Sequence, residues 1–288
     1  MPYSTQAQLR TAYDGGQKLA TYKVTSSLAR RNGKLLDLWD ISGLPAAGTM
    51  PATLAGTALS SASTGALPLR NASLDAQYLG SASLATTIAG TDFSSSGTIP
   101  TNSEVVIHVF DRLWHNGSIL ATTTSRQSWV STPITRYTNG SGVSVWLRWI
   151  SSGSGTTTSN LLLEYTNQSG ASASVNISVR TSVDGISSPG DLWPLGLAGG
   201  DSGIRSLDAS TMATSLSSGS YGFVLMRYLG SFVSKPSSIP QSGTSFLRGL
   251  PKIEDNACLC FALQGPPTAG ATTLFNHTYT LTGDLVVI

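Results

Sequence analysis

The stretch that decides the fold class runs Glu104-Val-Val-Ile-His-Val-Phe-Asp-Arg-Leu-Trp114 and then His115-Asn116-Gly117-Ser118. The first part is rich in β-branched and aromatic residues, and residues 119–124 resume with Ile, Leu, Ala and three Thr. Asn-Gly between two strand-like runs is the strongest short-range hairpin signal, because a type I′ turn needs positive φ at both central residues. The sequence therefore predicts an antiparallel hairpin, with its turn at 115–118.

The same pattern, short apolar runs separated by Gly, Ser, Asn and Pro, continues from about residue 71 to residue 288. Residues 174–180 alternate between apolar and polar throughout, as a strand with one buried face does. We expect strands near 78–89, 104–114, 118–124, 143–151, 158–166, 173–181, 220–229, 257–263 and 273–281, with 285–288 as a tail. The absence of crossover-helix patterns makes a parallel sheet implausible. The prediction is an all-β fold, an antiparallel β-sandwich or jelly-roll-like domain over 71–288.

Residues 1–70 differ in character and are predicted to form an extended N-terminal arm. A short helix is expected at 4–14, with Ser4 or Thr5 as its cap and Asp14-Gly15-Gly16 at its end. Residues 42–70 are rich in Pro, Gly and small side chains, which excludes a regular helix or a central strand. Two readings stay open: the arm lies on a neighbouring protein, or it packs back on its own sandwich.

If the arm binds a partner, its apolar, basic and proline residues are the candidate contacts. Apolar anchors contribute about 1.5–3 kcal/mol each when fully buried, and prolines keep the segment extended before it binds. The predicted partner-binding residues are Leu36, Leu38, Trp39, Arg30, Arg31, Pro45 and Pro51.

The composition is unusual in its low charge. Only 11% of the 288 residues are charged, against about 25% in an ordinary soluble domain. Residues 1–34 carry six basic residues and one acidic residue, a net +5, and the remainder carries 11 basic and 14 acidic, a net −3. A surface this poor in charge is typical either of a chain covered by partners or of a β-protein with a Ser/Thr surface. The basic N-terminal stretch can meet an acidic surface, but no nucleic-acid motif accompanies it.

The two cysteines stand in the triplet Cys258-Leu259-Cys260, which in a strand places both thiols on one face. They are too few for a disulfide framework or a zinc site. We interpret them as buried thiols of a protein that matures in a reducing compartment.

No motif predicts catalysis, a metal or a cofactor. There is no Gly-x-Ser-x-Gly elbow. Asp111 with His115 could be half of a triad, although no serine is placed by a motif, and an ion pair with a turn histidine is the simpler reading. Trp146 and Trp149 have opposite parity on one expected strand, so one should face inward and the other should be free to contact a partner.

Several segments resemble a family of virion structural proteins from tailed bacteriophages. The matching stretches, in order along the chain, are Leu38-Trp39, Gly43-x-Pro45, Gly48, 65–68, 78–80, 111–117, 165–170, 199–207 and 222–227. The resemblance implies a capsid-associated protein of the decoration or cement type, with no catalytic residues. It would be located in the virion and assembled in the host bacterial cytoplasm.

Three functions follow as hypotheses. The first is a minor capsid protein that binds the major capsid protein or other virion proteins and stabilises the head, as a homo-oligomer, with a trimer expected first. It would bind no membrane and no specific nucleic acid. The alternative is a carbohydrate-binding head-fibre or tail protein that contacts the host surface. A β-fold hydrolase is the third, and no motif supports it.

Overall fold

The computed structural model describes residues 11, 14–25, 28–31, 35–69, 77–92, 105–154, 158–180, 188–234, 252–264 and 274–287. All named elements in these ranges are strands that pair antiparallel, which confirms the predicted all-β class. No helix of the described residues has the length and apolar character needed to cross a membrane. The helix predicted at 4–14 falls almost wholly outside the described residues.

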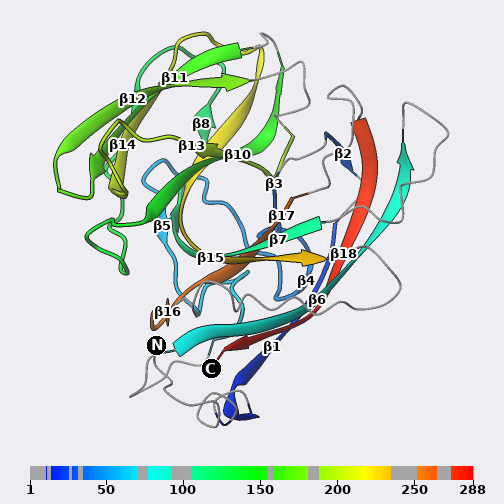
Figure 1. The fold of residues 1–288 in the computed structure, drawn as a ribbon. Coiled ribbons are helices and arrows are strands. Elements are labelled where there is room, and N and C mark those ends of the chain that lie inside the picture. Colours follow the sequence, from blue (N-terminus) through cyan, green and yellow to red (C-terminus); the bar gives the residue numbers. More distant parts are fainter. Residues whose placement is uncertain are drawn as a thin grey trace.

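The centre of the fold is a closed six-stranded barrel (Figure 1). Its strands are β3 (Leu35–Asp37), β7 (Val105–His115), β10 (Val143–Ser154), β13 (Asp191–Leu195), β15 (Ser218–Ser234) and β17 (Leu259–Gln264). They pair in the order β7-β17-β3-β13-β10-β15, and a further pairing of β15 with β7 closes the ring. Two-residue strands, β5 (Thr57–Ala58) and β8 (Ile119–Leu120), extend it. A barrel of this size is filled by its own side chains.

Two open sheets flank the barrel on different sides (Figure 1). The larger consists of β1 (Gln17–Val24), β2 (Leu28–Arg31), β4 (Gly43–Leu44), β6 (Gln77–Asp92), β16 (Lys252–Ile253) and β18 (Leu274–Val287). The smaller consists of β9 (Gln127–Ser128), β11 (Thr158–Asn167), β12 (Ser172–Arg180) and β14 (Ile204–Met212). The predicted sandwich is therefore a barrel between two sheets, because the central sheet closes on itself.

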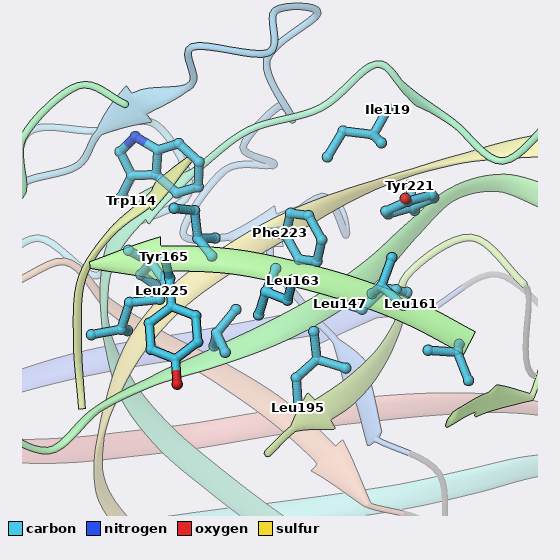
Figure 2. Close-up of a cluster of buried hydrophobic side chains, with 14 of the residues drawn as sticks. Trp114, Ile119, Leu147, Leu161, Leu163, Tyr165, Leu195, Tyr221, Phe223 and Leu225 are labelled. Atoms are coloured by element: carbon cyan, nitrogen blue, oxygen red, sulfur yellow. The ribbon is translucent and has the colours of Figure 1, made fainter. Parts of the chain in front are cut away.

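Alternation along the barrel strands builds three cores. On β17, Leu259 and Phe261 face the larger sheet and pack with Leu19 and Leu281, whereas Cys260 belongs to the barrel interior. On β10, the outward side chains pack on the smaller sheet in the cluster shown in Figure 2. The residues labelled there are Trp114, Ile119, Leu147, Leu161, Leu163, Tyr165, Leu195, Tyr221, Phe223 and Leu225.

The cores fix the orientation of the two cysteines and of Trp146 and Trp149. Cys258 and Cys260 are both free and buried in the same cluster, which confirms the reading of paired core thiols. Trp149 is buried in the cluster between the barrel and the smaller sheet. Trp146 points into the barrel, where it is partly buried against Phe110, with 5.5 Å between the ring centroids. The two rings do take opposite sides of the strand, but the closed barrel leaves neither on an open face.

The predicted hairpin at 115–118 is wrong. β8 does not return along β7, since both strands pair with β15: His115 lies opposite Val224, and Ile119 lies opposite Tyr221. The chain therefore continues along the same partner after a short irregular step. The positive φ in this step falls on Ser118, at 61°, and not on Asn116 or Gly117.

Asn116 explains why the chain does not turn back. Its backbone N–H donates to Phe223 O at 3.0 Å, and its side-chain Oδ1 accepts from Phe223 N at 2.7 Å. Its Nδ2 donates to Leu54 O at 3.0 Å. Gly117 is required for a close approach, because a Cβ there would lie 2.1 Å from Pro51 O. Asn-Gly thus serves long-range contacts with β15 and the 51–54 loop.

The described part of the predicted N-terminal arm is not separate from the body of the protein. β3 lies inside the barrel between β13 and β17, and β1 pairs with β18 along its length. The loop 45–69 is held by backbone bonds such as Leu59 N to Leu113 O and Leu67 N to Leu259 O, at 2.9 and 3.0 Å. For the described part of residues 1–70, this geometry replaces the predicted arm with a segment that packs on its own chain.

We expect Asn116→Ala to lower the free energy of unfolding by about 2–4 kcal/mol, because it leaves the buried Phe223 N–H and Leu54 C=O short of partners. Urea unfolding followed by tryptophan fluorescence measures the change. Ser118→Gly is the matched control, since glycine adopts the positive φ of this position without strain. An Asn116→Ala protein as stable as the wild type would refute the role given to this side chain.

Candidate functional site

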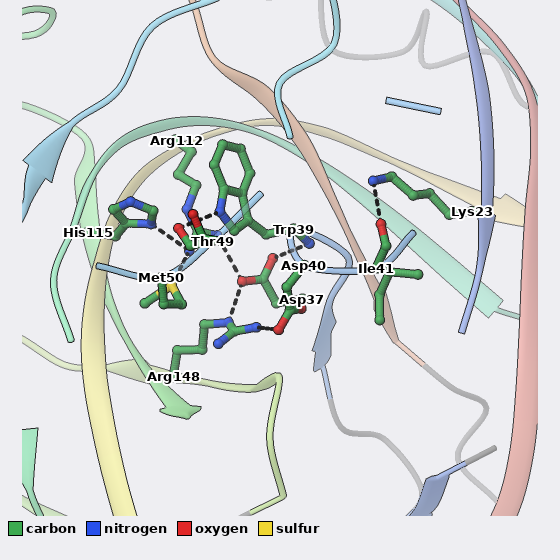
Figure 3. Close-up of polar contacts among 10 residues, drawn as sticks. All are labelled: Lys23, Asp37, Trp39, Asp40, Ile41, Thr49, Met50, Arg112, His115 and Arg148. Atoms are coloured by element: carbon green, nitrogen blue, oxygen red, sulfur yellow. Dashed lines mark hydrogen bonds and ion pairs between the residues drawn. The ribbon is translucent and has the colours of Figure 1, made fainter. Parts of the chain in front are cut away.

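The most concentrated set of polar side chains lies inside the barrel (Figure 3). Asp37, at the end of β3, accepts from Arg112 Nη1 on β7 at 2.8 Å and from Arg148 Nε on β10 at 2.7 Å, both through Oδ2. Arg148 Nη2 also reaches Asp40 Oδ2 at 2.6 Å. The side chains of Asp37, Arg112 and Arg148 are at most 2% exposed, and each comes from a different strand.

Trp39 and its neighbours enclose this cluster at one end. Arg112 lies over the Trp39 ring at 4.7 Å from its centroid, and Trp39 N donates to Asp37 Oδ1 at 3.1 Å. Arg112 Nη2 contacts His115 Nδ1 at 3.3 Å and the sulfur of Met50 at 3.1 Å. The guanidinium is therefore stacked, paired and covered, which is what burial of a full charge requires.

The charges fix the protonation state of the cluster. Burial would raise the pKa of Asp37, but the charges of Arg112 and Arg148 outweigh it and hold the pKa below its usual value. Burial, together with the positive charge of Arg112, lowers the pKa of His115 to about 2. His115 is thus a neutral imidazole at physiological pH, and its Nδ1 accepts the hydrogen bond from Arg112.

Asp111 belongs to a second buried pair. Arg136 donates to it twice, from Nε to Oδ2 at 3.0 Å and from Nη2 to Oδ1 at 2.7 Å. Cys258 N donates to the same carboxylate at 2.9 Å, and Arg136 Nη1 donates to Leu59 O at 2.7 Å. The carboxylate of Asp111 is therefore occupied in joining β7 to the loops that contain Arg136 and Cys258, and Arg136 in turn holds the loop at Leu59. The half-triad of Asp111 and His115 is not formed, since His115 contacts Arg112 instead.

The chemistry available in the barrel is that of a scaffold. Burial raises the pKa of Cys258 to about 12, which keeps the thiol protonated and unreactive. Within the described ranges, no three His, Cys, Asp or Glu side chains are grouped to hold a metal ion. Each carboxylate of the two ionic clusters faces an arginine at hydrogen-bond distance. These groups hold the strands and loops of the barrel together.

The residues predicted to bind a partner are placed differently from the expectation. Leu36, Leu38 and Trp39 are 2–3% exposed and lie in the chain's own cores, so their predicted role as anchors on a neighbour is corrected. Pro45 is buried and Pro51 is half-buried. Arg30 and Arg31 lie on β2, opposite Phe275 and Leu274 of β18, and their side chains are outside the described ones.

A shallow groove of about 470 Å³ lies on the outer face of the smaller sheet. It is lined by Arg126, Leu162, Glu164, Tyr165, Ser172, Ala173, Ser174 and Asp208. Arg126 and Glu164 form a bidentate pair across it, at 2.7 and 2.8 Å, and this hydrogen bonding lowers the pKa of Glu164. The groove can hydrogen-bond a polar ligand. Its one aromatic residue, Tyr165, is fully buried and offers no stacking face.

Two of the stretches that resemble phage proteins meet beside this groove. Tyr165 OH donates to Asp201 Oδ2 at 2.6 Å, and Asn167 Nδ2 donates to Asp201 Oδ1 at 2.8 Å. Arg205 donates to Gln168 O at 2.7 and 3.1 Å. Neither this junction nor the strand β14, in which Arg205 lies, was predicted from the sequence. The alternation in 204–212 was the available signal, but a β-bulge near Asp208 interrupts it.

Comparisons with known proteins add little. No family model and no curated protein matches this chain. Among solved structures, the VP2 subviral particle of infectious bursal disease virus is similar over 93% of this chain and 80% of that chain, at 9% identity and a TM-score of 0.19. The T13 particle of that virus is similar over 96% and 79%, at 10% identity and the same TM-score. The likeness is to viral capsid proteins, and it is too weak to carry an argument.

We expect Asp37→Asn to destabilise the protein by about 3–5 kcal/mol, because it leaves Arg112 and Arg148 buried without their shared carboxylate. Denaturant unfolding measures this loss. Glu254→Gln removes an exposed pair with Lys252 and is expected to change the free energy of unfolding by less than about 1 kcal/mol. Equal effects of the two substitutions would show that the barrel cluster is not the constraint described here.

The pKa of His115 predicts an acid-sensitive stability. The unfolded chain binds a proton at His115 below pH ~6.5, whereas the folded chain does not until about pH 2. Folding is therefore opposed increasingly as the pH falls below 6.5, by about 2 kcal/mol at pH 5. His115→Asn, which retains an acceptor, should remove this part of the pH dependence. A wild type and a variant with parallel stability curves from pH 7 to pH 5 would disprove it.

Proposed function

We propose that this chain is a virion structural protein that binds the capsid shell as a decoration or cement protein. The observation that carries the proposal is where the charges lie. Seven charged residues of the described chain are buried: Lys23, Asp37, Asp111, Arg112, Arg136, Arg148 and Asp191. The whole sequence has only 17 basic and 15 acidic residues, and with these seven inside the protein few charges remain for its surface. Such a surface suits a protein whose faces are covered by neighbours.

In this proposal, the location on a phage particle is inferred from the resemblance to tailed-phage structural proteins. The role in stabilising the particle is inferred from the internal ion pairs. A barrel cross-linked by buried charges resists deformation, because separating its strands exposes unpaired charges. We propose the major capsid protein or other virion proteins as partners, a homo-oligomeric state, and no enzymatic turnover. The arrangement of carboxylates and His115 in closed contacts supports the last point.

The buried positions of Leu36, Leu38 and Trp39 move the proposed attachment surface elsewhere. Tyr22 and Leu44 lie opposite each other across β1 and β4, and they are 52% and 49% exposed. β4 ends the larger sheet, so this pair sits at its edge. Basic and small residues adjoin it on the same strand, with Lys18 and Ala20 exposed. This surface, apolar with a basic margin, fits an acidic and apolar patch on a shell subunit.

Particles that lack this protein provide the test. We expect added purified protein to bind them and to raise the temperature at which they release their genome. Tyr22→Asp should weaken this binding at least about tenfold, because it places a charge in an apolar contact. Val130→Asp is the control, since Val130 is 89% exposed near β9, on the other flanking sheet. Absence of the chain from purified virions would refute the proposal.

The alternative, a carbohydrate-binding head-fibre or tail protein, is favoured by one feature, the groove beside Glu164 and Asp208. Carboxylates and serine hydroxyls are suitable partners for sugar hydroxyls, although the groove lacks an exposed aromatic ring. Binding of host surface glycan by the purified chain, abolished by Glu164→Ala, would favour this function over the first.

A further inference from the structure

The strand β12 differs from every other strand that ends a sheet in the described chain. The other sheet ends are β16, β4, β5, β8 and β9, each of two residues, and β2, which pairs only with β18, has four. β12 has nine residues and pairs with β11 in one unbroken register, without a bulge. Proteins usually shorten, charge or kink an exposed edge strand to prevent association. This edge has none of these features between Ser172 and Val179.

The hydrogen-bond phase of β12 can be derived from the turn that precedes it. Asn167 N donates to Ala171 O at 2.9 Å, so these two residues form a bonded pair. Bonded pairs recur at every second position of an antiparallel ladder. With Tyr165 opposite Ala173 and Leu163 opposite Val175, the odd-numbered residues of β12 bond to β11. The residues whose N–H and C=O groups point away from β11 are therefore Ser172, Ser174, Asn176 and Ser178.

No other strand of the described residues pairs with this outer side of β12. The four residues with outward backbone groups are also exposed on the outer face. On the inner face, Ala173, Val175 and Ile177 pack on the core beneath the sheet but are only half-buried. In the part of the chain that the structure describes, this edge thus offers unpaired backbone donors and acceptors together with a row of incompletely covered apolar side chains.

The sequence of β12 is nearly symmetric about Asn176. Read outward in both directions, Val175 mirrors Ile177, Ser174 mirrors Ser178, and Ala173 mirrors Val179. An antiparallel pair of identical strands centred on this residue therefore places β-branched side chains opposite each other on the inner face and serines opposite each other on the outer face. Cross-strand pairs of this kind stabilise a sheet, and no like charges meet between Ser174 and Ser178.

We propose that β12 is a self-association edge, at which two copies of this chain pair antiparallel across a two-fold axis at Asn176. Asn176 of one copy and Asn176 of the other form the central bonded pair, flanked on each side by Ser174 with Ser178. These three pairs give about six backbone hydrogen bonds, two from each bonded pair. The two smaller sheets become one continuous eight-stranded sheet, and the contact is isologous and closed. This assembly does not depend on a role in a virion.

Charge substitutions at the axis test the proposal in the purified full-length chain. The wild type should sediment at twice the mass of one chain at micromolar concentration. Asn176→Lys and Asn176→Asp each place like charges directly opposite, and each should raise the dimer dissociation constant about tenfold or more. An equimolar mixture of the two variants should restore the dimer. Ser128→Lys, exposed on β9 at the other end of the same sheet, is the control and should leave the dimer intact.

A cysteine at the axis tests the register. The Cα atoms of a bonded pair are about 5.5 Å apart, within disulfide range, so Asn176→Cys should form a dimer that is cross-linked on oxidation. In Ser174→Cys the two thiols belong to residues about 14 Å apart along the strands and should not cross-link. The native Cys258 and Cys260 are buried and do not compete. A monomeric wild type, a dimer unaffected by Asn176→Lys, or equal cross-linking at 174 and 176 would overturn the proposal.

Discussion

Asp37 carries the constraint on which the rest of the structure depends. It stands at the end of a strand of only three residues, and that strand supplies the link between β13 and β17 in the ring. The backbone hydrogen bonds of only three residues would hold such a strand weakly. The two arginines on Asp37 come from β7 and β10, which lie elsewhere in the ring, so the ion pairs brace the barrel across its interior. Removing the carboxylate would leave the buried Arg112 and Arg148 without their shared partner, and this penalty makes the short strand indispensable.

The ion pairs also explain why the N-terminal segment belongs to the body. Trp39 and Met50 cover Arg112, and Lys23 donates to Ile41 O at 2.8 Å. Residues 39–50 therefore cover the charged interior of the barrel. Composition alone suggested a free arm, since Pro, Gly and small residues dominate 42–70. The same residues are what a closely fitted loop needs. Gly48, for example, leaves no room for a Cβ beside the Trp39 ring, which would lie 2.3 Å away.

How far the sequence predicts this fold depends on the range of the interactions. The strands at 143–151, 158–166 and 173–181 follow from local alternation, and the structure places strands there. The hairpin at Asn116 fails because the asparagine bonds to Phe223, 107 positions away, and no local pattern reports that contact. For Asp111 and His115 the sequence left open half of a triad or, more simply, an ion pair beside a turn histidine, and the structure shows ion pairs at Asp111 and Arg112. Arg112 pairs with Asp37, 75 positions away, and Asp111 pairs with Arg136, 25 positions away. No local pattern reports these contacts, so the structural role of the two residues could not be predicted.

The closure of the barrel sets an order of events during synthesis. β3 ends at Asp37 and pairs with Ala262–Gln264 of β17, so the ring cannot form until 227 further residues have been made. At elongation rates of about 5–20 residues per second, β3 waits roughly 10–45 s for its partner β17. During that interval β3 lacks its backbone pairing with β17, although Arg112, Arg148 and β13 have already been made. A topology of such long-range pairs folds slowly. The barrel can therefore close only after residue 264 has been made, and until then the concentration of nascent chains is a determinant of the yield.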